Sequence, residues 1–164
     1  MDPLVEAIYW FRHAVNRLDY LEKLLYERDR KLYRRLTSLL AKGDREAANK
    51  TLSELADNRK HLEAVIAIRH FLSPVEITLV QLLKGMDRDL GLEYLVVKEA
   101  YGMTRDLDIE VHYALEELLE YLKQLHPRPT LEDKKKAEDM LLNASAQAKR
   151  EILSRLKPTP SIPP

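Results

Sequence analysis

The sequence contains no cysteine and only four glycines among its 164 residues. The absence of cysteine excludes a disulfide scaffold, a thiolate metal site and a cysteine nucleophile. The phosphate-binding patterns G-x-G-x-x-G and G-x-x-x-x-G-K-[ST] do not occur. No apolar run approaches the roughly 20 residues of a membrane-spanning helix, and the N-terminal residues lack the layout of a signal peptide. We therefore expect a soluble intracellular protein that forms one domain.

Acidic and basic residues balance, with 27 of each and a formal net charge of zero. This balance argues against a general nucleic-acid-binding protein, because such proteins are usually strongly basic. The charges are nevertheless segregated along the chain. Residues 1–72 carry 14 basic and 11 acidic side chains, whereas residues 73–164 carry 13 and 16, so the two halves have net charges of +3 and −3.

The difference in charge between the two halves is largest in two short segments. The first, here called the basic cluster, has six members: Lys23, Arg28, Arg30, Lys31, Arg34 and Arg35. The second, the acidic face, also has six: Asp106, Asp108, Glu110, Glu116, Glu117 and Glu120. Either these segments are unrelated solvated helix faces, or the acidic segment folds back on a basic surface.

The spacing of apolar residues predicts a long first helix. Asp2 suits the N-cap and Pro3 the first turn, and no further Gly or Pro occurs before Gly43. Apolar residues recur at steps of three, four and seven from residue 4 to residue 39. Roughly 38 residues at about 1.5 Å each make a rod of about 57 Å. This length exceeds the diameter of about 40 Å of a compact domain, so an elongated molecule is expected.

A second long helix follows after a very short turn. Gly43 suits the C′ position of the first helix and Asp44 the N-cap of the second. A turn this short forces the two helices to run antiparallel as a hairpin. Pro74 either kinks this second helix or begins a new one, because Ser73-Pro74-Val75-Glu76 fits both patterns.

The remaining sequence predicts three shorter helices, at about 92–101, at about 104–125 and from Thr130 onward, with Pro127 and Pro129 breaking the chain before the last. Small residues dominate the apolar stripe of the last helix, which indicates weak or reversible docking. Residues 156–164 (LKPTPSIPP) form an extended, proline-rich tail. The predicted fold class is all-α: an elongated antiparallel helical hairpin with three shorter helices packing back on it and an extended tail.

The best candidate for metal or catalytic chemistry is the set Asp108, His112 and Glu116, spaced i, i+4, i+8 on one helix face. One helix supplies at most two well-placed ligands, and the Glu-x-x-His pairs of a di-iron bundle are missing. No Ser or Thr lies in a recognisable nucleophile setting. We therefore predict no enzyme, no metal and no cofactor, and keep a metal-dependent bundle enzyme as the least favoured reading.

The basic cluster favours a binding or assembling protein. Arg28, Lys31 and Arg35 share one helix face at i, i+3, i+7, and Arg30 and Arg34 form an adjacent row. A rigid rod with such a stripe suits an anionic membrane surface, where each Lys or Arg is worth roughly 1 kcal/mol. It also suits polymer contacts with an acidic surface of a partner.

Three stretches of the two long helices form a further pattern: residues 27–33 (ERDRKLY), Lys42-Gly43-Asp44 with Ala47-Ala48, and residues 54–60 (ELADNRK). Together they resemble the helical hairpin of archaeal ESCRT-III proteins of the CdvB cell-division family. The likeness covers about residues 18–100 and rests on dispersed positions. The tail is similar to the proline-rich MIT-interacting motif by which such proteins recruit their AAA ATPase, through Leu156, Pro158, Pro160, Ile162 and Pro163.

The resemblance implies a division into an ESCRT-III-like core (1–126), a proline linker (127–129), a regulatory helix (130–157) and a proline-rich tail (158–164). It implies a cytoplasmic protein, peripheral at the inner membrane surface, that polymerises with itself and with ESCRT-III paralogues and remodels or cuts the membrane in cell division. The basic cluster would contact lipid or neighbouring subunits, the acidic face would keep the monomer autoinhibited, and the tail would bind an MIT-domain AAA ATPase. No nucleic-acid partner is implied. The alternative is a soluble helical-bundle adaptor without membrane activity.

Overall fold

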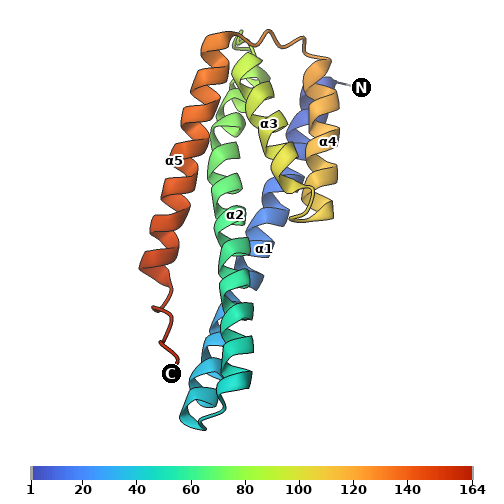
Figure 1. Ribbon diagram of the computed structural model, residues 1–164. Coiled ribbons are helices and arrows are strands. Elements are labelled where there is room, and N and C mark those ends of the chain that lie inside the picture. The colour runs from blue at the N-terminus through green and yellow to red at the C-terminus, as the bar shows by residue number, and fades with distance from the viewer. Residues whose placement is uncertain (1, 164) are drawn as a thin grey trace.

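The structure is a computed structural model that describes residues 2–163, and these residues form five helices and no strand. The long helices α1 (Pro3–Ala41) and α2 (Arg45–Leu83) have 39 residues each and form an antiparallel hairpin. The shorter helices α3 (Gly91–Thr104), α4 (Ile109–Lys123) and α5 (Leu131–Arg155) pack along the end of the hairpin away from its tip (Figure 1). The predicted fold class is thereby confirmed.

The hairpin turn follows the predicted capping chemistry. Gly43 has a φ of 75°, a left-handed conformation that costs glycine little. The carboxylate of Asp44 accepts a hydrogen bond from the Ala47 amide at 3.2 Å and caps α2. The carboxylate of Asp2 caps α1 in the same way through the Leu4 amide at 2.9 Å. Two residues of defined conformation therefore fix where the chain reverses.

α2 runs without interruption through Pro74, so the second long helix is single and no new helix begins there. Pro74 lies on the exposed side of the helix, whereas Phe71, Leu72 and Val75 around it are buried. The packing of these neighbours holds the helix together across a residue that cannot donate the usual backbone hydrogen bond.

Among the described residues, α2 is also the one helix long and apolar enough to cross a membrane by length and composition alone. Its most apolar window of 18 residues has a mean hydropathy of 1.4, and half of that window is buried inside the bundle. The sequence-based expectation that no stretch approaches this length was too strict, because an average over a window tolerates isolated polar residues. A core helix of a bundle passes the same test, so the finding is weak evidence for a membrane span.

The hydrophobic core is divided into two parts along the hairpin. The larger part lies where α1 and α2 meet the three shorter helices, and its fully buried side chains include Phe11, Leu18, Leu62, Phe71 and Leu118. The smaller part, here called the distal cluster, lies near the hairpin tip and consists of Leu32, Leu36, Ala48 and Leu55. The distal half of the hairpin therefore relies on a thin core of its own.

The shorter helices differ in detail from their predicted limits. α4 begins at Ile109 rather than near residue 104, because Asp108 is its N-cap and accepts a hydrogen bond from the Val111 amide. α5 begins at Leu131, and Thr130 is its N-cap and forms a capping box with Asp133. α5 ends at Arg155, two residues before the predicted 157, and Leu156 is already extended.

The small-residue stripe predicted for α5 is the face that it buries. Only alanines of this helix are fully buried, at positions 137, 144 and 148. An alanine removes little apolar surface from water compared with a leucine, whose burial contributes roughly 1.5–3 kcal/mol. α5 therefore packs on α2 and α3 through these alanines and through the partly buried Met140, Leu141 and Ile152.

Replacing Pro74 by Ala should raise the free energy of unfolding by about 1–2 kcal/mol. Alanine can donate the backbone hydrogen bond that proline lacks, and this stabilises α2. Alanine also raises the conformational entropy of the unfolded chain, which destabilises the fold, but we expect this effect to be smaller. Chemical denaturation followed by circular dichroism measures the effect. A loss of stability instead would show that a bend at Pro74 is needed to seat α3, α4 and α5 on the hairpin.

Candidate functional site

A nearly buried ion pair joins the two long helices at the border between the two parts of the core. Asp29 on α1 is 3% exposed. Arg59 on α2 binds it with both arms of the guanidinium, Nε to Oδ2 at 2.7 Å and Nη2 to Oδ1 at 3.2 Å. This two-pronged geometry is the strong form of a carboxylate–arginine contact. It compensates a carboxylate that would otherwise be costly to bury.

A second polar contact lies beside this pair. The side-chain amide of Asn58 donates a hydrogen bond to the Leu25 carbonyl oxygen at 2.9 Å. Together, Asp29, Asn58 and Arg59 form a polar layer between the larger part of the core and the distal cluster. A polar layer of this kind penalises any sliding of the two helices, because a shift would leave its members buried without partners.

The C-terminal tail folds back onto the hairpin at this layer. Nη1 of Arg59 donates to the Lys157 carbonyl oxygen at 2.9 Å and reaches Thr159 Oγ1 at 3.5 Å. Farther along, Ile162 packs against the distal cluster. One guanidinium thus holds both the hairpin and the tail, and the tail lies beside the lower half of the hairpin (Figure 1).

The predicted ATPase-binding residues of the tail fall into two sets in this conformation. Leu156, Pro160 and Ile162 are half-buried, whereas Pro158 and Pro163 are exposed. Pro164, the last residue of the predicted tail, lies outside the described residues, as does Met1 of the predicted core. The apolar side chains that a partner groove would need are therefore partly used within the chain itself.

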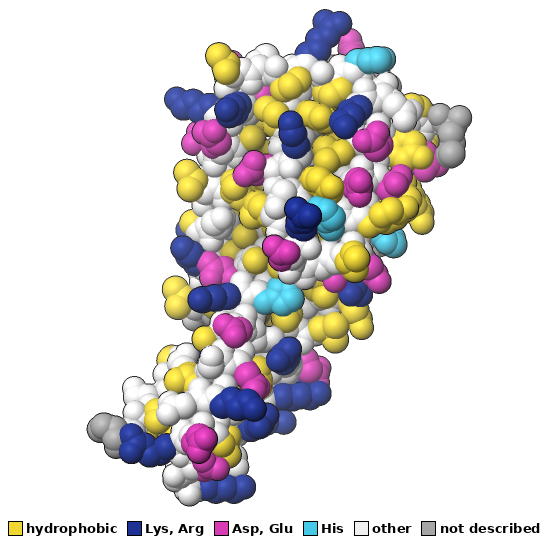
Figure 2. Space-filling view, turned by 45° about the vertical axis from the view of Figure 1, so that its right-hand side comes forward, with side chains coloured by type: hydrophobic (Ala, Val, Ile, Leu, Met, Phe, Trp, Pro, Cys, Tyr) yellow, Lys and Arg dark blue, Asp and Glu magenta, His cyan; other side chains and the backbone are white. Residues whose placement is uncertain are grey.

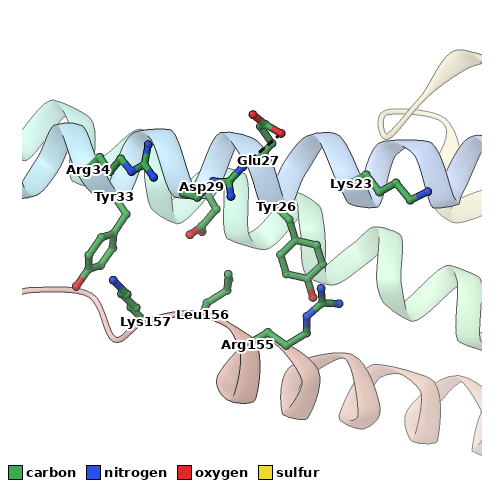
Figure 3. A pocket seen from close by; sticks show the side chains of 10 residues that line it. Lys23, Tyr26, Glu27, Asp29, Tyr33, Arg34, Arg155, Leu156 and Lys157 are labelled. Atoms are coloured by element: carbon green, nitrogen blue, oxygen red, sulfur yellow. Dashed lines mark ion pairs between the residues drawn. The ribbon is translucent and has the colours of Figure 1, made fainter.

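Two cation–π contacts connect α1 to the end of α5 and to the tail. The guanidinium of Arg155 lies 4.0 Å from the ring centre of Tyr26, and Nζ of Lys157 lies 5.4 Å from that of Tyr33 (Figure 3). Each such contact is worth roughly 0.5–1 kcal/mol at an exposed site. Burial raises the pKa of the Tyr26 hydroxyl, and the charge of Arg155 partly opposes that rise.

The basic cluster divides into two rows on opposite sides of the buried stripe of α1. Lys23, Arg30 and Arg34 line a cleft beside the tail. Arg28, Lys31 and Arg35 are exposed and do not line it. At 100° per residue this second set, here called the outer row, lies on the far side of the stripe from the tail. Figure 2 shows Lys and Arg side chains gathered over the end of the molecule that the hairpin tip forms.

The acidic face lies away from the basic cluster. Its Asp108 binds Arg17 on α1 at 3.1 Å, and its Glu110 lies 3.3 Å from the same guanidinium. Burial would raise the pKa of Asp108, but the hydrogen bonds from Arg17 and from the Val111 amide outweigh it and lower the pKa. Among the described residues, no ion pair joins the acidic face to the basic cluster. The segment that lies beside the basic cluster is the tail.

The other acidic residues have no partner on the hairpin among the ion pairs of the described chain. Glu120 pairs with Lys123 one turn away at 3.3 Å. Asp106 and Glu116 are exposed, and Glu117 is half-buried. These side chains form a solvated surface of α4 and of the loop before it.

The residues proposed for a metal are engaged elsewhere. Asp108 serves as helix cap and as partner of Arg17. His112 stacks on Tyr101 with ring centres 4.2 Å apart, and its Nδ1 lies 3.1 Å from Thr104 Oγ1. Glu116 is exposed. Within residues 2–163 no group of three or more His, Cys, Asp or Glu side chains gathers as a metal site would require.

Sequence reasoning missed the ion pair on which this site depends. The apolar stripe of α1 steps from Leu25 directly to Leu32, and the position between them that faces the core is Asp29. That gap in the stripe was the available sign of a buried polar group. A second missed contact joins His70 Nε2 on α2 to Glu151 Oε1 on α5 at 2.7 Å, and no short-range sequence pattern indicates it.

No protein-family model, curated protein or solved structure matches this chain.

Replacing Arg59 by Gln should lower the free energy of unfolding by about 3–5 kcal/mol, because Asp29 is then buried without its charge partner. Denaturant titration measures the loss. In the double variant D29N/R59Q the cost should be smaller than the sum of the two single costs by about 0.5–3 kcal/mol. Additive costs would show that the two side chains do not stabilise each other.

Proposed function

We propose that this protein is an ESCRT-III-like subunit that polymerises on membranes for remodelling or scission in cell division. The observation that carries the proposal is the combination of a long, exposed basic hairpin with a C-terminal segment folded back onto it. The resemblance of residues 27–33, 42–48 and 54–60 to the CdvB hairpin supports the same assignment. The protein acts at the cytoplasmic side of the membrane, as a peripheral and non-catalytic component.

The outer row is the part of the hairpin suited to an anionic membrane. Arg28, Lys31 and Arg35 are exposed on one side of a straight helix, so all three can reach a flat surface together. At roughly 1 kcal/mol each they contribute about 3 kcal/mol, equivalent to about 100-fold in affinity. The same row can contact an acidic surface of a neighbouring subunit, either another copy or an ESCRT-III paralogue.

The C-terminal part holds the molecule in the conformation seen here, which we call closed. α5 contributes an alanine stripe and the cation–π contact of Arg155, and the tail adds the Arg59 contacts, the cation–π contact of Lys157 and Ile162. The apolar side chains of the tail, Leu156 and Ile162, are only half-buried, so the tail can detach while the helices of the larger part of the core stay packed. Detachment frees the tail for an MIT-domain ATPase and uncovers the distal cluster for a neighbouring subunit.

Full-length protein should co-sediment with vesicles of phosphatidylserine and phosphatidylcholine. Binding should fall as salt rises, because exposed charges are screened. The variant R28E/K31E/R35E should bind at least about 100-fold more weakly. The matched control is K149E/R150E, which reverses two exposed charges on α5 and should bind almost as the parent does.

Absence of vesicle binding by the full-length protein would refute the membrane role. The remaining reading would then be a soluble adaptor, in which the segregated charges select protein partners.

An MIT domain of an AAA ATPase should bind the full chain weakly and bind R59Q more tightly. The apparent affinity of a partly hidden ligand is reduced by the fraction of molecules that expose it. Isothermal titration calorimetry measures both affinities. The variant L156D/I162D should lose binding although its tail is also released, which separates exposure of the tail from recognition of it. Equal affinities for all three chains would exclude the tail as the binding element.

A further inference from the structure

We propose that the cleft between α1 and the end of α5 binds a ligand with several phosphate groups, either a soluble polyphosphate or a phosphorylated lipid headgroup. The cleft has a volume of about 480 Å³. Ligand sites of proteins commonly measure roughly 300–1,000 Å³. Five basic side chains line it, three from α1 and two from the C-terminal segment: Lys23, Arg30, Arg34, Arg155 and Lys157 (Figure 3).

The cleft contains more positive charge than its acidic residues balance. Its two carboxylates already have partners, since Asp29 binds Arg59 and Glu27 lies 3.5 Å from Arg30 and 3.9 Å from Lys31. Within the described chain, four of the lining cations form no ion pair: Lys23, Arg34, Arg155 and Lys157. These four like charges line one cleft and repel one another, so a bound polyanion lowers the free energy of this arrangement.

The chemistry of the lining selects phosphate over an aromatic or apolar ligand. One face of the Tyr26 ring is occupied by Arg155 and one face of the Tyr33 ring by Lys157, which leaves less ring surface for a base to stack on. Among the described residues that line the cleft, Leu156 alone has an aliphatic side chain. What remains are guanidinium, ammonium and hydroxyl donors, and the Tyr26 hydroxyl is buried without a hydrogen-bond partner. Arginine binds phosphate oxygens in pairs, and four cations suit several phosphates better than one carboxylate.

The ligand should also stabilise the closed conformation. Arg155, Leu156 and Lys157 line the cleft only while the tail is docked. A ligand that binds the docked form and not the released form shifts the equilibrium toward docking by mass action. Binding itself is independent of the proposed function, whereas its consequence for assembly rests on it.

The test is isothermal titration calorimetry of the full chain with inorganic tripolyphosphate. We expect saturable binding that weakens with salt, and a binding constant at least tenfold weaker for orthophosphate. Two variants should each weaken tripolyphosphate binding at least tenfold: K23Q/R34Q on α1 and R155Q/K157Q on the C-terminal segment. The first pair makes no contact that holds the tail, so its effect does not depend on release of the tail.

Two matched controls remove the same charge outside the cleft. R45Q/K50Q on α2 and K149Q/R150Q on α5 involve exposed residues that do not line it. Both should bind tripolyphosphate within about twofold of the parent. The proposal would be overturned if cleft and control variants lost equal affinity for tripolyphosphate. It would also be overturned if neither tripolyphosphate nor phosphoinositide vesicles bound saturably.

Vesicles distinguish the source of the phosphates. One set contains a phosphatidylinositol bisphosphate, and a second set contains phosphatidylserine at equal surface charge. If R155Q/K157Q weakens binding only to the vesicles that contain phosphatidylinositol bisphosphate, the cleft binds a lipid headgroup. If this variant weakens only the binding of tripolyphosphate, the cleft binds a soluble ligand. Binding to phosphatidylserine vesicles tests the outer row and the proposed function separately, so either proposal can fail without the other.

Discussion

The ion pair between Asp29 and Arg59 is the interaction on which the lower half of the molecule depends. A buried carboxylate is costly unless it is fully paired, and the two contacts of the guanidinium meet that requirement. The same guanidinium extends to the Lys157 carbonyl. Hairpin register and tail position are therefore coupled through one side chain. A shift of α1 against α2 would expose Asp29 to an apolar neighbourhood and would remove the donor that holds the tail.

This constraint divides the hairpin into two regions of different stability. Above the polar layer, apolar side chains of all five helices pack together around Phe11, Phe71 and Leu118. Below it, the distal cluster has four buried residues and is helped by the half-buried Ile162 of the tail. The free energy of local unfolding is lowest where few apolar contacts are lost. The distal half and the tail are thus the parts that can change partners while the upper bundle keeps its fold.

The arrangement of the helices could be predicted from the sequence because each pattern that indicates it is local in the chain. The spacing of leucines, the Gly43–Asp44 turn and the Thr130 cap depend on neighbours within a few residues, and all three appear as predicted. The effect of Pro74 depends on packing against α3 and α5, so the local pattern left two outcomes open. The division of the basic cluster depends on which side of α1 the tail occupies, and the partner of Asp108 is 91 residues away in the chain. Such long-range contacts are set by the fold rather than by any short motif.

The separation of the two basic rows bears on what a closed conformation could regulate. The outer row, with Arg28, Lys31 and Arg35, stays exposed while the tail is docked. Docking instead occupies the other side of α1, where Lys23 and Arg34 line one cleft together with Arg155 and Lys157, and it covers part of the distal cluster. A surface that remains exposed in both conformations cannot be switched by the transition between them, whereas a covered one can. On the proposed function, closure would therefore leave attachment to an anionic membrane largely intact and would control contacts with neighbouring subunits and with the ATPase.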